Sequence, residues 1–260
     1  MPAFLLQPCE LLAITHRVGA KAILGMSQDE LFPPDLGREL DRGASLLGGR
    51  GLVALSGTAP RMDAALQDLA ETMVRPELAF AMTREVPGEA LQVYVGFLRA
   101  GCAVLHAKLP DGRHHLDALA NEGEIVSALI DAMAMPDSPR QIALSIPFDH
   151  LEAAAVLACD GDPAAASARL VWAGLQPRDA QQLAETFALP RSRNAVAAFR
   201  VVGIEITAEH QLTVWHGRDS LWQMQAMPDE DLISIEHTNP RHVKTTLQGF
   251  LADLHGKRWV

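Results

Sequence analysis

The chain has 260 residues, of which 48% are hydrophobic and 21% charged. This is enough apolar material for one large domain or two packed halves, and the composition excludes general disorder. The formal net charge is −10, from 22 Lys and Arg against 32 Asp and Glu, with no basic run. Because nucleic-acid affinity depends on neutralising phosphates with Lys and Arg, we expect no nucleic-acid partner.

The cysteines and the apolar segments bear on the compartment. Cys9, Cys102 and Cys159 lie far apart, an odd and scattered set that is typical of free thiols in a reducing compartment. The N-terminal apolar run is interrupted by Pro8 and Glu10 and lacks a basic region, unlike a signal peptide. No stretch approaches the roughly 20 apolar residues of a membrane span. The sequence predicts a cytoplasmic protein without membrane insertion.

The first half reads as helices followed by a meander of strands. Residues 9–18 and 36–47 have helical apolar spacing, and the glycines of GGRG then end the second helix. GGRG lacks the Lys-Ser/Thr of a phosphate-binding P-loop, so we interpret it as a helix stop. Four strands follow over residues 78–84, 90–98, 102–109 and 113–119, and then a helix over residues 122–133. Leu91, Val93, Val95 and Phe97 alternate as in a half-buried strand.

The second half repeats this order. Alanine-rich helices run from Phe148 to Pro190, with Pro163 and Pro177 suited to open two of them. Strands are predicted at residues 195–206, 211–218, 220–227 and 231–237, and Pro228-Asp229 takes the place of the turn Pro110-Asp111. Asn239 is a good N-cap for a final helix.

Two ten-residue segments show that the order is a repeat. QDLAETMVRP (67–76) and QQLAETFALP (181–190) are identical at six positions, with an offset of 114. We infer an internal duplication, with related halves at residues 1–136 and 137–260. A four-stranded meander cannot bury its apolar face alone. We therefore predict one α+β domain of two units around a pseudo-two-fold axis, each with helices, an antiparallel meander and a C-terminal helix, and with sheets joined or adjacent and covered by helices.

Several polar groups are candidates for sites of chemistry. His114 and His115 point to opposite faces of a strand, so with His106 we interpret them as surface histidines and not as a metal site. CDGD (159–162) is predicted to be a helix–helix loop in which Asp162 caps the next helix. Glu71 and Glu185 are equivalent in the repeat and are expected to be solvated helix-face carboxylates. We expect no catalytic residues, no metal and no cofactor.

The layout resembles the EspG family of ESX (type VII) secretion-associated proteins. The segments that carry the resemblance are CELLAITHRVG, RELDRGASLLGGRGLV, ALQDLAETMVRPELAFAM, DAQQLAETFALPRS and LISIEHTNPRHVKTTLQGFLADL. The resemblance covers nearly the whole chain. It implies a cytoplasmic, chaperone-like protein whose partner is a helical export substrate of the PE–PPE type. It also implies an extended connection between the second and third strands, whereas the connection here is only Arg99-Ala100-Gly101.

A binding role needs an apolar patch with a polar rim. We therefore assign Arg99, Ala100 and Gly101 to a candidate partner-binding surface, since they form the second–third strand connection. Trp215, Trp222 and Met224 join it as an adaptable Met/Trp surface, although they are equally suited to the core. Two alternatives stay open: an enzyme with its site at the junction of the halves, and a structural homo-oligomer or homodimer that pairs sheet edges.

Overall fold

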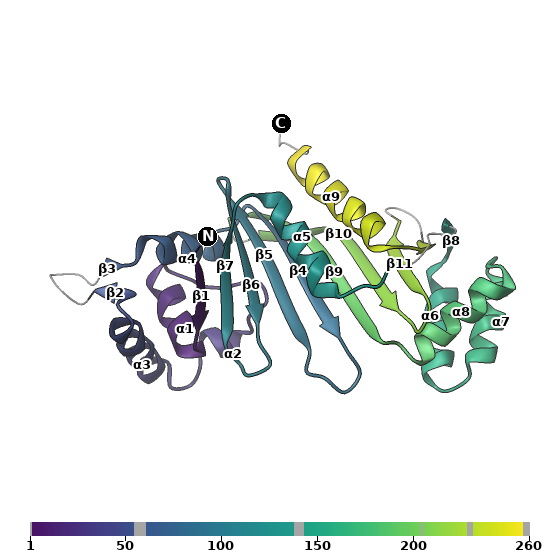
Figure 1. Cartoon of the computed structure of the whole chain (residues 1–260), viewed down its shortest axis with the longest axis horizontal. Helices are drawn as coiled ribbons and strands as arrows, with labels where there is room; N and C mark the ends of the chain where they lie inside the picture. The colour runs from purple at the N-terminus through teal and green to yellow at the C-terminus, as the bar shows by residue number, and fades with distance from the viewer. Residues whose placement is uncertain (1, 55–60, 138–142, 204, 228–230, 257–260) are drawn as a thin grey trace. The chain divides into compact units, whose positions relative to one another are not determined.

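A computed structural model describes residues 2–54, 61–137, 143–203, 205–227 and 231–256. The chain forms two compact units (Figure 1). Unit 1 comprises Met1–Ala81, Gln92–Ala128 and Ala198–Ala208, and unit 2 comprises Met82–Leu91, Leu129–Ala197 and Glu209–Val260. Each unit packs helices on antiparallel strands, which confirms the predicted α+β class. Among the described helices, none combines the length and the apolar character needed to cross a bilayer.

Unit 1 opens with an edge strand and helices, and the meander follows. Its elements are β1 (Ala3–Leu6), α1 (Pro8–Arg17), α2 (Gln28–Leu31), α3 (Leu36–Gly49), β2 (Val53–Ala54), β3 (Arg61–Met62), α4 (Ala64–Val74), β5 (Gln92–Arg99), β6 (Cys102–Lys108) and β7 (His114–Leu119). The strand order is β1-β7-β6-β5-β4, and β2 pairs with β3 separately.

Unit 2 has the same plan. Its elements are β8 (Ala143–Pro147), α6 (Phe148–Cys159), α7 (Pro163–Trp172), α8 (Pro177–Ala188), β11 (Leu221–Ala226), β12 (Leu232–His237) and α9 (Pro240–Gly256). Four elements have residues in both units: β4 (Leu78–Glu85), α5 (Glu122–Met133), β9 (Ser192–Val202) and β10 (Glu205–His216). The strand order is β9-β10-β11-β12-β8, and β4 is the neighbour of β9.

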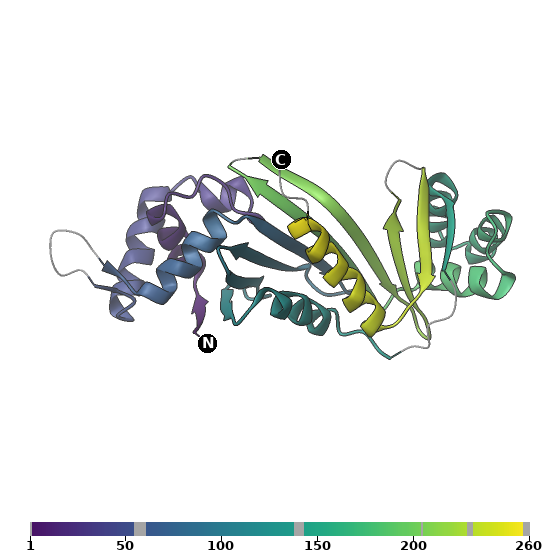
Figure 2. The same cartoon turned by 90° about the horizontal axis from the view of Figure 1, so that it is seen from above.

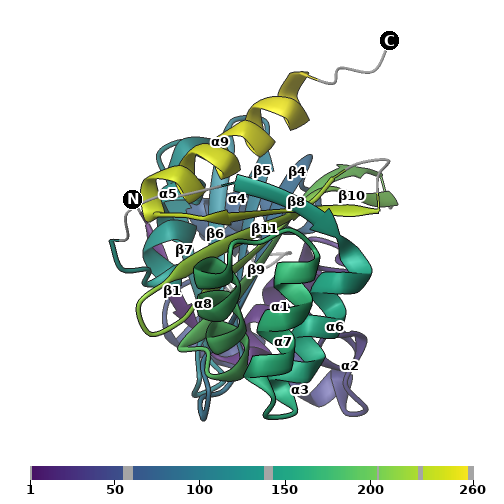
Figure 3. The ribbon, with the colours of Figure 1, turned by 90° about the vertical axis from the view of Figure 1, so that its right-hand side faces the viewer.

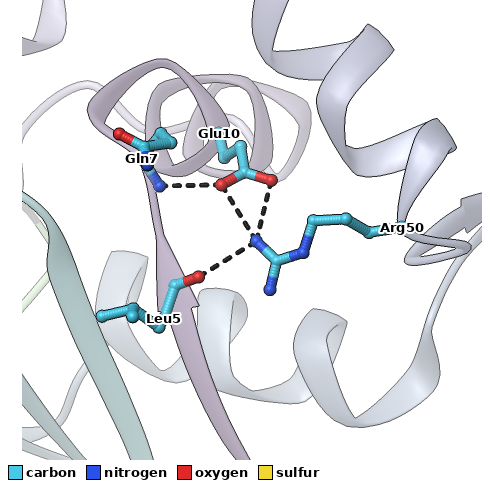
Figure 4. A network of polar contacts seen from close by, with 4 residues as sticks. All are labelled: Leu5, Gln7, Glu10 and Arg50. Atoms are coloured by element: carbon cyan, nitrogen blue, oxygen red, sulfur yellow. Dashed lines mark hydrogen bonds and ion pairs between the residues drawn. The ribbon is translucent and has the colours of Figure 1, made fainter.

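The buried carboxylate of Glu10 links β1, α1 and the end of α3 (Figure 4). Arg50 Nη1 donates to both carboxylate oxygens of Glu10, at 2.9 and 3.0 Å, and to the carbonyl oxygen of Leu5 at 3.0 Å. The backbone N–H of Gln7 donates to Glu10 Oε2 at 2.7 Å and completes a capping box at the start of α1. Since Glu10 is only 1% exposed, these bonds are what make its burial tolerable.

Unit 2 has three layers. α6, α7 and α8 pack on one face of its sheet, around Trp222, Met224 and Ile235. α9 lies on the other face, where Gln223 Nε2 donates to Thr246 Oγ1 at 3.0 Å. Figure 2 shows α9 in front of the strands, and Figure 3 shows the two helical layers on opposite faces.

The repeated decapeptides form the same local structure. Gln67 Nε2 donates to Glu71 Oε1 at 2.9 Å in α4, and Gln181 Nε2 donates to Glu185 Oε1 at 2.9 Å in α8. Both threonines also donate to the carbonyl one turn earlier, Thr72 to Asp68 and Thr186 to Gln182, each at 2.8 Å. The repeat found in the sequence is therefore a repeat of structure at these two helices.

The strand registers extend this correspondence into the sheets. Directly after the decapeptides, Glu77 N–H donates to Leu98 O at 2.8 Å, and Arg191 N–H donates to His216 O at 2.7 Å. These two hydrogen bonds occupy the same place in the two units, so Leu98 is equivalent to His216, and the preceding residues Phe97 and Trp215 are equivalent as well. The strand pairings then make three further positions equivalent: His106 to Met224, His114 to Ile233, and Phe4 to Leu144.

Several details differ from the sequence prediction. The strand predicted over residues 195–206 ends at Val202, and β10 already begins at Glu205, because Gly203 with φ of 64° turns the chain there. Leu91 lies outside β5 and is exposed. β1, β8, β2 and β3 were not predicted, and the turn Pro228-Asp229 lies outside the described residues. The minimal hairpin is confirmed: Ala100 and Gly101, with φ of 49° and 82°, connect the paired Arg99 and Cys102.

Candidate functional site

A groove of 320 Å³ opens in unit 2 between α6 and the sheet. Its wall and floor are mostly apolar, with polar residues interspersed. The lining residues are Phe148, Leu151, Glu152, Ala155, Phe187, Arg193, Gln211, Leu212, Thr213, Trp215, Met224, Ala226 and Ile233. A concave apolar surface with a few polar groups is what ligand and partner sites share.

The α6 wall follows from helical spacing. Phe148, Glu152 and Ala155 lie at positions i, i+4 and i+7, so their side chains share one face of the helix. Ala154 points to the core and is buried, and the largely buried Leu151 lies between the core and the groove that it also lines. Phe148 remains 51% exposed at the start of the helix, which leaves an aromatic ring available at the mouth of the groove.

The floor centres on Trp215. Phe187 of α8 meets its ring edge-on, with 5.0 Å between the ring centroids. The guanidinium carbon of Arg193 lies 5.2 Å from the ring centroid of Trp215, within cation–π range, and Arg193 also pairs with Glu85 at 3.6 Å. The groove thus presents an aromatic anchor beside a positive charge.

A second cavity of 330 Å³ shares part of this lining. It also contains Phe187, Arg193 and Trp215, and it extends to Glu85, Val86, Pro87, Cys159, Ala188 and Pro190. The groove and this cavity therefore form one concave surface that runs from Phe148 to the β4–β5 connection.

Exposed apolar side chains gather on the neighbouring helices. These are Phe148, Val156, Val171, Trp172 and Leu189. Trp172 is 72% exposed, its ring centroid lies 4.4 Å from that of His150, and Arg169 lies 5.2 Å from it. Trp and Arg dominate interface energetics, so the exposed Trp172 beside Arg169 is suited to an interaction site.

The equivalent floor in unit 1 is covered by the chain itself. Residues 18–35 connect α1 to α3 there, whereas only residues 160–162 connect α6 to α7. Gly25 approaches so closely that an added Cβ would lie 2.6 Å from Val95 Cγ2. Glu30 of α2 pairs with Lys108 of β6. Val95 is equivalent to Thr213, so the short α6–α7 connection is what leaves the floor of unit 2 open.

The structure separates the six predicted partner-binding residues. Trp215 and Met224 line the groove, but Met224 is buried, and Trp222 is buried beside a different pocket. Arg99, Ala100 and Gly101 lie in unit 1 at the β5–β6 turn. Arg99 pairs with Glu71 at 3.4 Å, so Glu71 is an ion-pair partner as well as a helix-face carboxylate.

The prediction of surface histidines was wrong for two of the three. His106 Nε2 and His114 Nδ1 lie 2.9 Å apart, and both residues are buried, on the sheet face where Glu30 of the α1–α3 connection pairs with Lys108. Burial lowers the pKa of His106 to about 3 and that of His114 to about 4. Within the described ranges, no three His, Cys, Asp or Glu side chains are grouped to hold a metal ion.

The predicted cap at CDGD is confirmed. Asp162 Oδ1 accepts a hydrogen bond from the backbone N–H of Ala165 at 2.9 Å, at the start of α7. The groove residues Phe148, Glu152, Phe187 and Arg193 were not predicted. The signal was present in the spacing of Phe148, Glu152 and Ala155, but identifying the face they line required the position of the sheet.

No protein-family model matches the sequence, and a search of curated proteins finds no match. The structure does match that of the Mycobacterium tuberculosis type VII secretion system chaperone EspG5, solved in complex with the PE25–PPE41 dimer. The similarity covers 96% of both chains, with a TM-score of 0.75 and 12% sequence identity. The chain has the fold of EspG5. This EspG-type fold confirms, at the level of architecture, the family resemblance that the sequence suggested.

Proposed function

We propose that the chain is a chaperone-like protein that binds a helical substrate of a type VII (ESX) secretion system in the cytoplasm and catalyses no reaction. The partner is a PE–PPE-like helical protein. The observation that carries the proposal is the open apolar groove of unit 2, in a chain that shares the fold of EspG5.

The two units together support the groove as the contact surface. In unit 1 the equivalent floor is covered by residues 18–35, which place buried Ile23 and Leu31 against that unit's core. A partner segment would do the same in unit 2, with apolar side chains on Trp215 and Met224. Arg193 favours an acidic residue on that segment, because opposite charges fix the register of a docked chain.

The six predicted residues enter the proposal with different roles. Trp215 and Met224 form the floor, and Trp222 supports the floor from its buried position. The turn Arg99-Ala100-Gly101 is a proposed second contact. Cys102 is exposed beside that turn, so a crosslinker attached to Cys102 in a Cys159→Ser variant and recovered on the partner would test it, because the substitution removes the other exposed thiol.

The main experiment recovers the partner from the native host with an affinity-tagged full chain. Mass spectrometry should identify a helical secretion-type protein with the wild type. Phe148→Asp, at the groove mouth, should reduce its recovery roughly tenfold, because an interface anchor is replaced by a charge. Phe32→Asp is the matched control, since Phe32 is 43% exposed in unit 1, and its recovery should equal that of the wild type.

Circular dichroism of both variants keeps the comparison valid by showing that each is folded. Recovery of no helical partner with the wild type would contradict the proposed function. Equal recovery with Phe148→Asp and with the wild type would instead exclude the groove as the contact surface.

We further propose that the chain is a single domain made of two related halves, residues 1–136 and 137–260. The recurring order of edge strand, helices, meander and helix supports this, as do the matched bonds of α4 and α8. Superposition of the halves in an experimental structure tests it, and halves that do not superpose would contradict it.

A further inference from the structure

Another pocket of unit 2, distinct from the groove and from the 330 Å³ cavity beside it, has a volume of 160 Å³. It lies between the sheet, at its edge strand β8, and the start of α8. Its lining residues are Leu144, Gly174, Leu175, Gln176, Asp179, Trp222, Ile235 and His237. An engineered apolar cavity of about 150 Å³ takes up benzene, so this pocket has the size of one aromatic ring.

The corresponding place in unit 1 is filled by such a ring. The strand pairings make Phe4 equivalent to Leu144, because Phe4 pairs with Leu116 and Leu144 pairs with Ile235. Phe4 packs against the core of unit 1. By the same registers, the wall residues Val104 and Ala118 of unit 1 are equivalent to Trp222 and His237. Unit 2 therefore has leucine where unit 1 has a phenyl ring.

The walls also contain buried polar atoms without partners. Within the described residues, Trp222 Nε1 and both ring nitrogens of His237 have no hydrogen-bond partner, although the residues are only 3% and 5% exposed. Leaving a buried donor or acceptor unpaired destabilises the folded chain, so a ligand that pairs with it is favoured. Burial lowers the pKa of His237, so the neutral ring keeps one donor and one acceptor nitrogen. The χ2 torsion of histidine is broad, so the ring can turn a nitrogen toward the pocket.

From this arrangement we propose that the pocket binds a small molecule with a single aromatic ring and a neutral polar edge, in the place that Phe4 takes in unit 1. An amide fits this description, because its carbonyl accepts from Trp222 or His237 while its N–H groups find acceptors in His237 and Asp179. A carboxylate fits less well, since Asp179 already contributes negative charge to the lining.

The test uses the ¹⁵N-labelled full chain and three probes: benzamide, benzoate and toluene. Benzamide should shift the indole N–H signal of Trp222 in a saturable way, with an affinity roughly tenfold above those of benzoate and toluene, a difference of about 1.4 kcal/mol. Absence of a saturable shift with any probe would overturn the proposal, and the pocket would then hold water only.

Two exchanged variants sharpen the test. Leu144→Phe should fill the pocket, raise the melting temperature without a probe and abolish the benzamide shift. Phe4→Leu should create a site in unit 1 that takes toluene as readily as benzamide, because Ala118 offers no polar side chain there. Undiminished benzamide binding by Leu144→Phe would contradict the assignment. Leu144→Met is a second filling variant for the case in which the phenylalanine does not fold.

Discussion

The two sheets have equivalent residues on one face, but this face is covered in unit 1 and open in unit 2. In unit 1, Val95, His106 and His114 are buried beneath the long connection between α1 and α3. In unit 2 their equivalents Thr213, Met224 and Ile233 line an open groove. The difference shows how one plan can give a closed core in one copy and an open groove in the other, through the length of a single connection.

The same contrast appears at the repeated helices. Arg75, at the end of α4, donates from Nη2 to Val18 O at 3.2 Å, so this end is held to the rest of unit 1. The equivalent Leu189 at the end of α8 is 81% exposed. Met73 and the equivalent Phe187 are both buried, at 1% and 2% exposed, although Phe187 also lines the groove. The two copies therefore differ at the ends of these helices and not in the burial of their apolar faces.

The largest expected effect comes from a substitution in the α1–α3 connection, residues 18–35, which covers the sheet of unit 1. Gly25→Val would place a Cβ against Val95 at a residue whose φ is +82°. Overpacking and left-handed strain together should destabilise unit 1 by about 3 kcal/mol. Hydrogen exchange should show β5 amides losing protection while β11 amides keep theirs. Gly88→Val is the control, because φ is also positive at Gly88 but no atom lies within 4 Å of an added Cβ. This variant should lose only the part of the stability that comes from left-handed strain.

The next largest effect is the loss of stability of unit 1 in acid, through its buried histidine pair. The pKa values of His106 and His114 are lowered to about 3 and about 4, below the unfolded value of 6.5. Their stabilising contribution is complete above pH 6.5 and is lost as the pH falls, because the unfolded chain binds protons first. Between pH 7 and pH 5 we expect unit 1 to lose on the order of 2 kcal/mol or more.

The double variant His106→Met with His114→Leu serves as the control for this loss. It gives unit 1 apolar residues like those of unit 2, which do not titrate. Urea unfolding monitored in unit 1 should then be nearly independent of pH over this range. If the variant keeps the wild-type pH dependence, other groups are responsible for it.

The smallest effect concerns the decapeptide threonines. Thr72→Val removes one intrahelical bond and should cost less than about 1 kcal/mol. Thr186→Val should cost about 1 kcal/mol more, because Thr186 Oγ1 also lies 2.8 Å from the buried Ser220 Oγ. Denaturant unfolding of the two variants measures the difference. Equal costs would mean that the Ser220 contact contributes nothing.

The sequence predicted the meanders and most helices because their apolar periods are long enough to be distinctive. β1 and β8, with four and five residues, are too short for a period to be recognised, and both lie directly before a helix. The hairpin at Gly203 was misplaced because β10 begins with exposed residues from Glu205 to Ala208, which break the expected alternation.

The groove could not be predicted from the sequence for a different reason. It depends on a covering segment that one copy has and the other does not, and that contrast is visible only when the strand registers are aligned. The burial of His106 and His114 likewise depends on residues of the distant α1–α3 connection. Trp215, one of the predicted partner-binding residues, lies on the floor of this groove, and its role there stays a prediction.

The interleaving of the two units has a consequence for how such a protein could arise. A chain of residues 1–136 lacks the strand ends Ala198–Ala208, and a chain of residues 137–260 lacks Met82–Leu91. Under the proposed duplication, a single ancestral copy would have needed a second molecule of itself to supply the contacts of these strand ends. Gene fusion would then have made that exchange permanent and freed each copy to diverge.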